Sequence, residues 1–120
     1  MIAKKDMPAC PVATTVEVIG SKWKLLILRD ILQGPKRFGE LKHGLQGISQ
    51  KMLTQSLREM ERDGVLIRTK YPTVPPQVEY SLSELGETMR PVIAEMEKWG
   101  ASYKTKAGPI DQPRRTADTL

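Results

Sequence analysis

One stretch of the chain, Ser49–Asp63, has the marks of a helix with a defined start, a defined end and two different faces. Ser49 can cap its first turn, because a serine hydroxyl accepts a hydrogen bond from an unsatisfied amide there. Gly64 follows the last turn, where a glycine in the left-handed conformation ends many helices. With about 100° between successive residues, an apolar face lies opposite a polar, cationic one. The apolar residues are Leu53, Leu57 and Met60, and the polar ones are Lys51, Thr54, Gln55, Arg58 and Arg62.

The polar face of this helix is almost free of acids, because Glu59, Glu61 and Asp63 fall on its flanks. A helix that buries one side and presents amides, a hydroxyl and cations on the other is suited to the major groove of DNA. An ordinary solvated helix face has a similar composition, so charge alone leaves both interpretations open.

A shorter helix is expected just before it. Phe38, Leu41 and Leu45 recur at the spacing of one apolar helix side. The segment 44–47 contains two glycines and permits a sharp turn before Ser49, so the pair has the plan of a helix-turn-helix. No Ser, Thr, Asp or Asn caps the start of the shorter helix, and that boundary is not defined by the sequence.

After Gly64 the pattern changes from helical to alternating. Val65–Tyr71 and Gln77–Leu82 are expected to be strands, joined by the proline-stiffened loop 72–76, with Tyr80 in the core. A hairpin directly after the second helix gives the element order of a winged helix-turn-helix. A plain surface hairpin is the alternative.

Two helices are expected before the helix-turn-helix. Pro11–Ile19 begins with proline, which is favoured at the first helical position, and Gly20 ends it. The segment from Lys22 to about Gln33 is apolar on two sides, so we expect it to be the scaffold in the middle of the domain.

The last helix is expected from Glu84 to about Lys104, with a bend or break at Pro91, because proline removes one backbone hydrogen bond. Its apolar residues step by four and three, as in a heptad seam. Such a seam can pack on its own domain, but a short chain has little surface to cover both this helix and the first one. We therefore expect a two-fold dimer through the N- and C-terminal helices. The expected interface residues are Val12, Val16, Ile19, Met89, Val92, Met96, Trp99 and Tyr103.

Charge is unevenly distributed along the chain, whose formal net charge is +5. Residues 22–70 hold eleven Lys and Arg against five Asp and Glu, whereas residues 84–97 hold four acids against one Arg. The basic middle favours a polyanionic partner. We expect base edges or adjacent phosphates to be contacted by Gln50, Lys51, Thr54, Gln55 and Arg58. We expect phosphates to be contacted by Lys36 or Arg37, Arg62, Arg68 and Lys70.

The length of 120 residues predicts one domain, mainly α with a small β-hairpin, over residues 10–104. Residues 1–9 are expected to form a flexible arm and residues 105–120 a disordered tail. No segment has the apolar length of a membrane span and residues 1–10 lack the core of a signal peptide, so we expect a cytoplasmic protein. We expect neither a metal nor a cofactor.

Short sequence blocks occur in a specific order and spacing between Cys10 and Tyr103. They are CP at 10–11, VIGSKW at 18–23, RFGEL at 37–41, ISQKMLT at 48–54, LR at 57–58, ERDG at 61–64 and YSL at 80–82. Together they resemble the HxlR-type regulators, a branch of the bacterial winged-helix group related to MarR. Ser21 departs from the usual second glycine of the second block, but serine also caps a helix well. The resemblance implies a homodimeric transcription regulator on a pseudo-palindromic operator.

Cys10 is the one cysteine of the chain and immediately precedes Pro11, so it can lie at the N-terminus of the first helix. The helix dipole, with Lys4 and Lys5 nearby in sequence, would favour the thiolate. The resemblance implies that Cys10 senses oxidants or electrophiles, as the matching cysteine does in some relatives. The alternative is a small buried hydrophobic residue without a redox role.

Three other functions compete with a redox-sensing DNA-binding regulator. A thiol enzyme using Cys10 is disfavoured, because the one histidine, His43, lies in a different element and no carboxylate pair or phosphate loop is present. A regulator that binds a small-molecule effector at the dimer interface has no residue signature here. A winged-helix module that binds protein does not need the acid-poor face of Ser49–Asp63.

Overall fold

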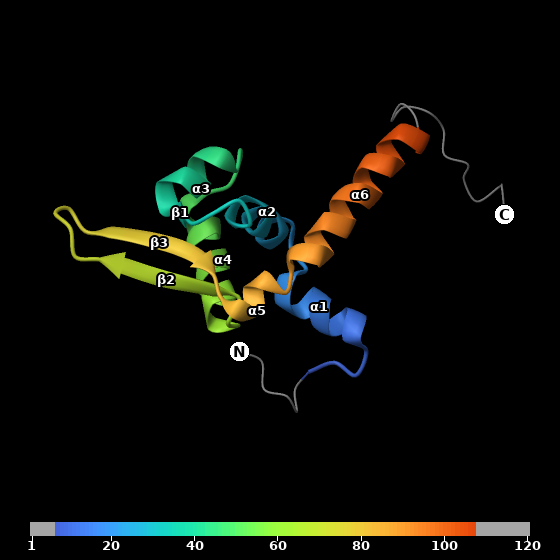
Figure 1. Ribbon diagram of the computed structural model, residues 1–120, viewed down its shortest axis with the longest axis horizontal. Coiled ribbons are helices and arrows are strands. Elements are labelled where there is room, and N and C mark those ends of the chain that lie inside the picture. The colour runs from blue at the N-terminus through green and yellow to red at the C-terminus, as the bar shows by residue number, and fades with distance from the viewer. Residues whose placement is uncertain (1–6, 108–120) are drawn as a thin grey trace.

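The computed structural model describes residues 7–107, which form a mainly helical fold with one small antiparallel sheet (Figure 1). The fold class expected from the sequence is confirmed. The helices and strands are α1 (Pro11–Ile19), α2 (Lys22–Ile31), β1 (Lys36–Arg37), α3 (Phe38–Gly44), α4 (Gln50–Arg62), β2 (Leu66–Tyr71), β3 (Gln77–Leu82), α5 (Glu84–Glu87) and α6 (Arg90–Ala107). Of the expected arm and tail, residues 1–6 and 108–120 lie outside the described residues.

Helix α2 lies at the centre of the fold, between the helix-turn-helix and the pair α1 and α6 (Figure 1). Ile27 and Leu28 are fully buried on it, and Ile31 is nearly so. Trp23 packs against the same core from the first turn of the helix. The scaffold role expected from its two apolar sides is confirmed, although the helix ends at Ile31, two residues earlier than expected.

Helices α3 and α4 form the helix-turn-helix. Leu45 and Ile48, in the connection between them, are both buried. The Ser49 hydroxyl accepts a hydrogen bond from the Met52 amide at 3.0 Å, as its capping role requires. At the start of α3, the Glu40 carboxylate accepts a hydrogen bond from the Arg37 amide at 2.8 Å. This contact defines the boundary for which the sequence showed no capping residue.

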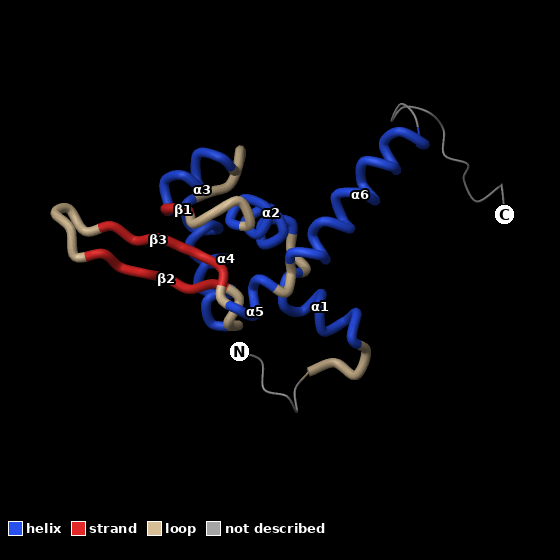
Figure 2. The backbone as a smooth tube through the Cα atoms, in the orientation of Figure 1, coloured by secondary structure: helices blue, strands red, loops and turns tan. Residues whose placement is uncertain are grey.

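The sheet has the strand order β1-β3-β2, and all pairs are antiparallel. Strands β2 and β3 form the expected hairpin, which projects from the helices with its loop outermost (Figure 2). Strand β1 was not expected. It is only two residues long, too short to show alternation, and it pairs Lys36 with Tyr80 and Arg37 with Glu79. Tyr80 is buried in the core, as predicted.

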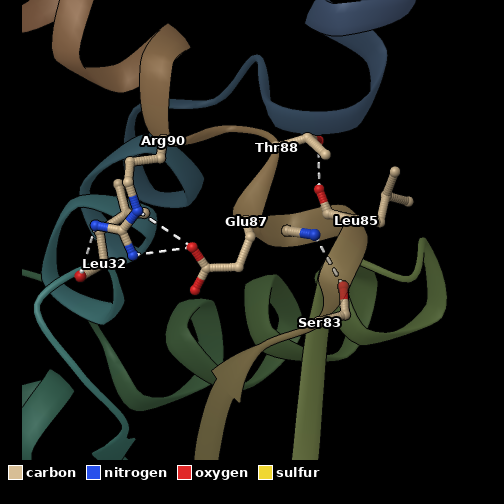
Figure 3. A network of polar contacts seen from close by, with 7 residues as sticks. Leu32, Ser83, Leu85, Glu87, Thr88 and Arg90 are labelled. Carbon is tan, nitrogen blue, oxygen red and sulfur yellow. Dashed lines mark hydrogen bonds and ion pairs between the residues drawn. The ribbon is translucent and has the colours of Figure 1, made fainter.

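The helix expected over residues 84–104 is broken into α5 and α6. The break falls at Thr88 and Met89, whose amides donate to carbonyls three residues earlier. Pro91 follows at the second position of α6, where its missing N–H has no helical partner to lose. The Arg90 guanidinium bridges the junction, because it donates both to the Glu87 carboxylate and to the Leu32 carbonyl at the end of α2 (Figure 3). The proline therefore breaks the helix, as expected, on its N-terminal side.

Helices α1 and α6 leave apolar side chains exposed. Val12 is 71% exposed and Trp99 69%, and Val16, Met96 and Tyr103 are also exposed. Helix α6 extends away from the rest of the fold (Figure 1) and continues to Ala107, three residues beyond its expected end. Among residues 7–107, no helix is both long and apolar enough to cross a membrane.

Two residues expected in the dimer interface belong to the core of the single chain. Ile19 is only 3% exposed, and Met89 packs against the core. The accessible apolar surface of the terminal helices is therefore smaller than the heptad pattern suggested. The other residues expected in the interface stay exposed: Val12, Val16, Val92, Met96, Trp99 and Tyr103.

Candidate nucleic-acid interface

Helix α4 buries one apolar side and exposes the opposite, polar side, although Met52 is also exposed. Leu53, Leu57 and Met60 are each at most 1% exposed, and Ser56, on the same side, is 4% exposed. They pack against α2 and β2, which fix the orientation of the helix. The opposite side lies in solvent and is lined by Gln50, Lys51, Gln55, Arg58 and Arg62, with Thr54 half-buried beside them. We call these six residues the polar face of α4.

Two of the acids near this face, Glu59 and Asp63, are restrained, whereas Glu61 is exposed. The Glu59 carboxylate accepts a contact from the Lys24 ammonium of α2 at 2.7 Å and a hydrogen bond from the Gln55 side-chain amide at 3.1 Å. The hydrogen bond from Lys24, followed by the one from Gln55, holds the pKa of Glu59 below its ordinary value. Asp63 is buried at the end of α4, with the Arg62 guanidinium 3.5 Å from its carboxylate. The outward surface therefore keeps a cationic character.

The predicted phosphate contacts outside α4 lie on the two edges of the sheet. Lys36 and Arg37 form β1, and Arg68 and Lys70 lie on β2, with β3 between them. Arg68 and Lys70 pair with Tyr80 and Val78 and so share one face of the hairpin. Lys36 is half-buried, and the other three are exposed. The structure thus places these cations on both edge strands of the sheet, β1 and β2, rather than in one cluster.

The other face of the hairpin carries a different contact. The Tyr71 hydroxyl donates to the Glu79 carboxylate at 3.0 Å, and this hydrogen bond raises the pKa of Tyr71. Because neighbouring residues of a strand point to opposite faces, this acid does not lie beside Arg68 and Lys70. The cationic face of the hairpin is left without an opposing carboxylate from the paired residues.

The two remaining candidate residues lie on separate elements. Cys10 is exposed at the N-cap of α1, and its carbonyl accepts the Thr14 amide at 3.0 Å. His43 is exposed in the last turn of α3. Neither belongs to the polar face of α4, so a signal received at Cys10 would have to reach α4 through the fold.

Sequence reasoning missed one residue of this site, Lys24. Glu59 lies four residues after Gln55, and that spacing alone indicates a contact on a helix. Nothing in the sequence indicates that Lys24, 35 positions before Glu59 in a different helix, supplies its partner. The one sequence feature that indicated a special role for Lys24 was its position within an apolar helix.

Comparison with known proteins decides the family. The model of the family described as HxlR-like helix-turn-helix matches residues 18–107, which include all of α4 and the hairpin. The chain belongs to this family. The sequence-based resemblance to HxlR-type regulators is confirmed.

Two known regulators are similar to this chain over most of their length. The HTH-type transcriptional regulator YdeP of Bacillus subtilis is 46% identical over 115 residues, which cover 96% of this chain and 90% of YdeP. The redox regulator HypR in its oxidized form has a TM-score of 0.75 and 47% identity, covering 78% of this chain and 96% of HypR. Its reduced form has a TM-score of 0.77 and 45% identity, with 79% and 94% covered.

These findings give the general activity of the chain. It is a helix-turn-helix transcriptional regulator, and not an enzyme. The small thiol enzyme considered from the sequence is thereby excluded.

Proposed function

We propose that this HxlR-like regulator binds a pseudo-palindromic operator as a homodimer, with α4 of each subunit in the major groove. The observation that carries the proposal is the division of α4 into a fully buried apolar side and an exposed, cationic polar face. A helix fixed in this way can enter the groove without exposing its anchoring residues. In a two-fold dimer the two helices would lie roughly 34–36 Å apart, one turn of the duplex.

Each cation and amide has a role in this proposal. Gln50, Lys51 and Thr54, at the N-terminal half of α4, face base edges, and Gln55 and Arg58 reach bases or the adjacent phosphates. Arginine pairs with guanine and glutamine with adenine through two hydrogen bonds each. The phosphate contacts come from Lys36, Arg37, Arg62, Arg68 and Lys70, which fix the register but carry no sequence information.

Gel shift with a salt series tests the DNA-binding proposal, using a duplex from the region upstream of the protein's own gene and a random duplex. Replacing Arg58 or Gln55 by Ala should weaken binding to the preferred duplex by ~1–3 kcal/mol and reduce the difference between the two duplexes. Lys70→Ala should weaken both equally and make the salt slope shallower by about one unit.

Two results would contradict the assignment. Equal losses on both duplexes for Arg58→Ala and Gln55→Ala would remove these residues from sequence recognition. Binding to neither duplex at low salt would favour the alternative of a winged-helix module that binds protein.

We propose further that Cys10 makes DNA binding sensitive to oxidants or electrophiles. The support is its exposure at the N-cap of α1, together with the similarity to the redox regulator HypR. The thiols of two subunits can join as a disulfide, giving two electrons and two protons to the oxidant. Alternatively, the Cys10 thiolate can attack a small disulfide, breaking its S–S bond, to form a mixed disulfide and release the other half as a thiolate.

The test compares DNA binding by the wild type and Cys10→Ser before and after treatment with diamide or a quinone. Only the wild type should change its affinity, and a reducing thiol should restore the change caused by diamide. If both proteins respond alike, Cys10 is not the sensor. A response of both to an unreactive small molecule would favour an effector site at the dimer interface.

A further inference from the structure

The side-chain amide of Gln55, on the polar face of α4, is tied to the scaffold of the fold. Its Nε2 donates to Glu59 Oε2 at 3.1 Å, and Glu59 Oε1 accepts from Lys24 Nζ at 2.7 Å. The Lys24 side chain is only 11% exposed and that of Glu59 is 30% exposed. The three residues form a chain of contacts from α2, through Glu59, to a residue that faces solvent.

The contact with Lys24 offsets the negative charge of Glu59 next to the polar face of α4. A carboxylate beside the polar face of α4 would repel the phosphates of bound DNA. Lys24 supplies the opposite charge from the protein side, 2.7 Å from Glu59 Oε1, and this contact also lowers the pKa of Glu59. Glu59 is thereby kept available as a fixed acceptor for Gln55.

The contact with Glu59 also selects what Gln55 can offer a base. A glutamine amide has two N–H donors and one carbonyl acceptor, and its terminal torsion has two nearly equivalent orientations when unrestrained. With one N–H held by Glu59, one donor and one acceptor remain. This pair matches N7 and the N6 amino group of adenine, whereas guanine presents two acceptors, N7 and O6.

We propose that Lys24 is a positioning residue for base recognition: through Glu59 it fixes the Gln55 amide in the orientation that selects adenine over guanine. This inference rests on the proposed function, because it needs α4 in the major groove. It adds a residue of the scaffold helix, outside the polar face of α4, to the determinants of sequence preference.

The experiment uses labelled duplexes that the full-length wild type selects from a random-sequence pool, with each adenine replaced in turn by guanine. For the wild type, one position in each half-site should show a preference for adenine of about tenfold or more that Gln55→Ala removes. Lys24→Met should reduce the preference at that position to less than about threefold, whereas Lys24→Arg, which keeps a cation for Glu59, should retain it. In the Gln55→Ala background, Lys24→Met should change base preference no further.

Several outcomes overturn the inference while leaving the proposed function intact. One is an unchanged adenine preference in Lys24→Met. Another is that Lys24→Met lowers the affinity for all duplexes equally, and does so in the Gln55→Ala background as well. If Lys24→Met does not fold, Glu59→Ala breaks the same chain of contacts from the exposed side, and retention of the preference would overturn the inference as well. A wild type that selects no sequence from the pool contradicts the proposed function itself.

Discussion

The carboxylate of Glu59, beside the polar face of α4, contacts Lys24 of α2. Lys24 and Gln55 both donate to it, and they lower its pKa relative to the unfolded chain. In the range between the lowered and the ordinary glutamate pKa, the unfolded state binds more protons than the folded state. The Glu59 contribution to stability is therefore complete above the ordinary pKa and is lost as pH falls through the lowered one.

Glu59→Gln should accordingly make stability less dependent on pH in the acid range. Urea unfolding at one protein concentration should show that the wild type loses more free energy of unfolding than Glu59→Gln as pH is lowered from neutral to the glutamate range. Glu95→Gln is the matched control, because the Glu95 side chain is 72% exposed and has only an exposed i,i+3 pair with Lys98. Parallel pH profiles for the wild type and Glu59→Gln would contradict this assignment.

At the scale of elements, the junction between α5 and the turn after α4 is unusually close. A Cβ added at Gly86 would lie 2.2 Å from the Val65 carbonyl oxygen and 3.1 Å from a methyl group of Leu82. Both neighbours belong to the packed domain, and the nearer one is backbone, so the elements would have to separate. Gly86 is buried, which leaves no direction for easy relief.

Gly86→Ala should therefore destabilise the fold by about 1–3 kcal/mol, the typical cost of overpacking, as measured by the midpoint of urea unfolding. Gly39→Ala in α3 is the control, because a Cβ there meets nothing within 4 Å, and alanine should leave stability unchanged or raise it. Equal midpoints for the two variants would show that α5 moves away from Val65 at no cost.

How far the sequence predicted these elements depended on whether each signal was local. Ser49 and Ser83 cap the helices that follow them because capping needs only residues within one turn, and this is readable in sequence. The pairing of β1 with β3 joins segments about 43 positions apart and left no pattern in a two-residue strand. The Lys24–Glu59 contact is non-local in the same way. For the polar face of α4, periodicity predicted the exposed residues, but it could not show how Gln55 is held.

At the scale of the whole molecule, the single chain leaves apolar side chains of α1 and α6 in water. On α6, Trp99 stacks on Tyr103 with ring centroids 5.2 Å apart. Contiguous exposed apolar surface of this kind marks an interaction site. A symmetric partner would cover both helices and would set the distance between two copies of α4, so assembly and operator spacing are coupled in the proposed dimer.

Trp99→Glu tests this coupling, since a charge placed among apolar side chains of an interface has no partner to compensate its desolvation. Light scattering should give twice the chain mass of 13.5 kDa for the wild type and the single-chain mass for the variant. The variant should also bind a single half-site as the wild-type subunit does, but lose the gain in affinity from a second half-site. Val74→Glu is the control for assembly, because Val74 is fully exposed in the hairpin loop, away from α1 and α6. A dimeric Trp99→Glu protein that keeps the gain in affinity from the second half-site would mean that the subunits meet through another surface.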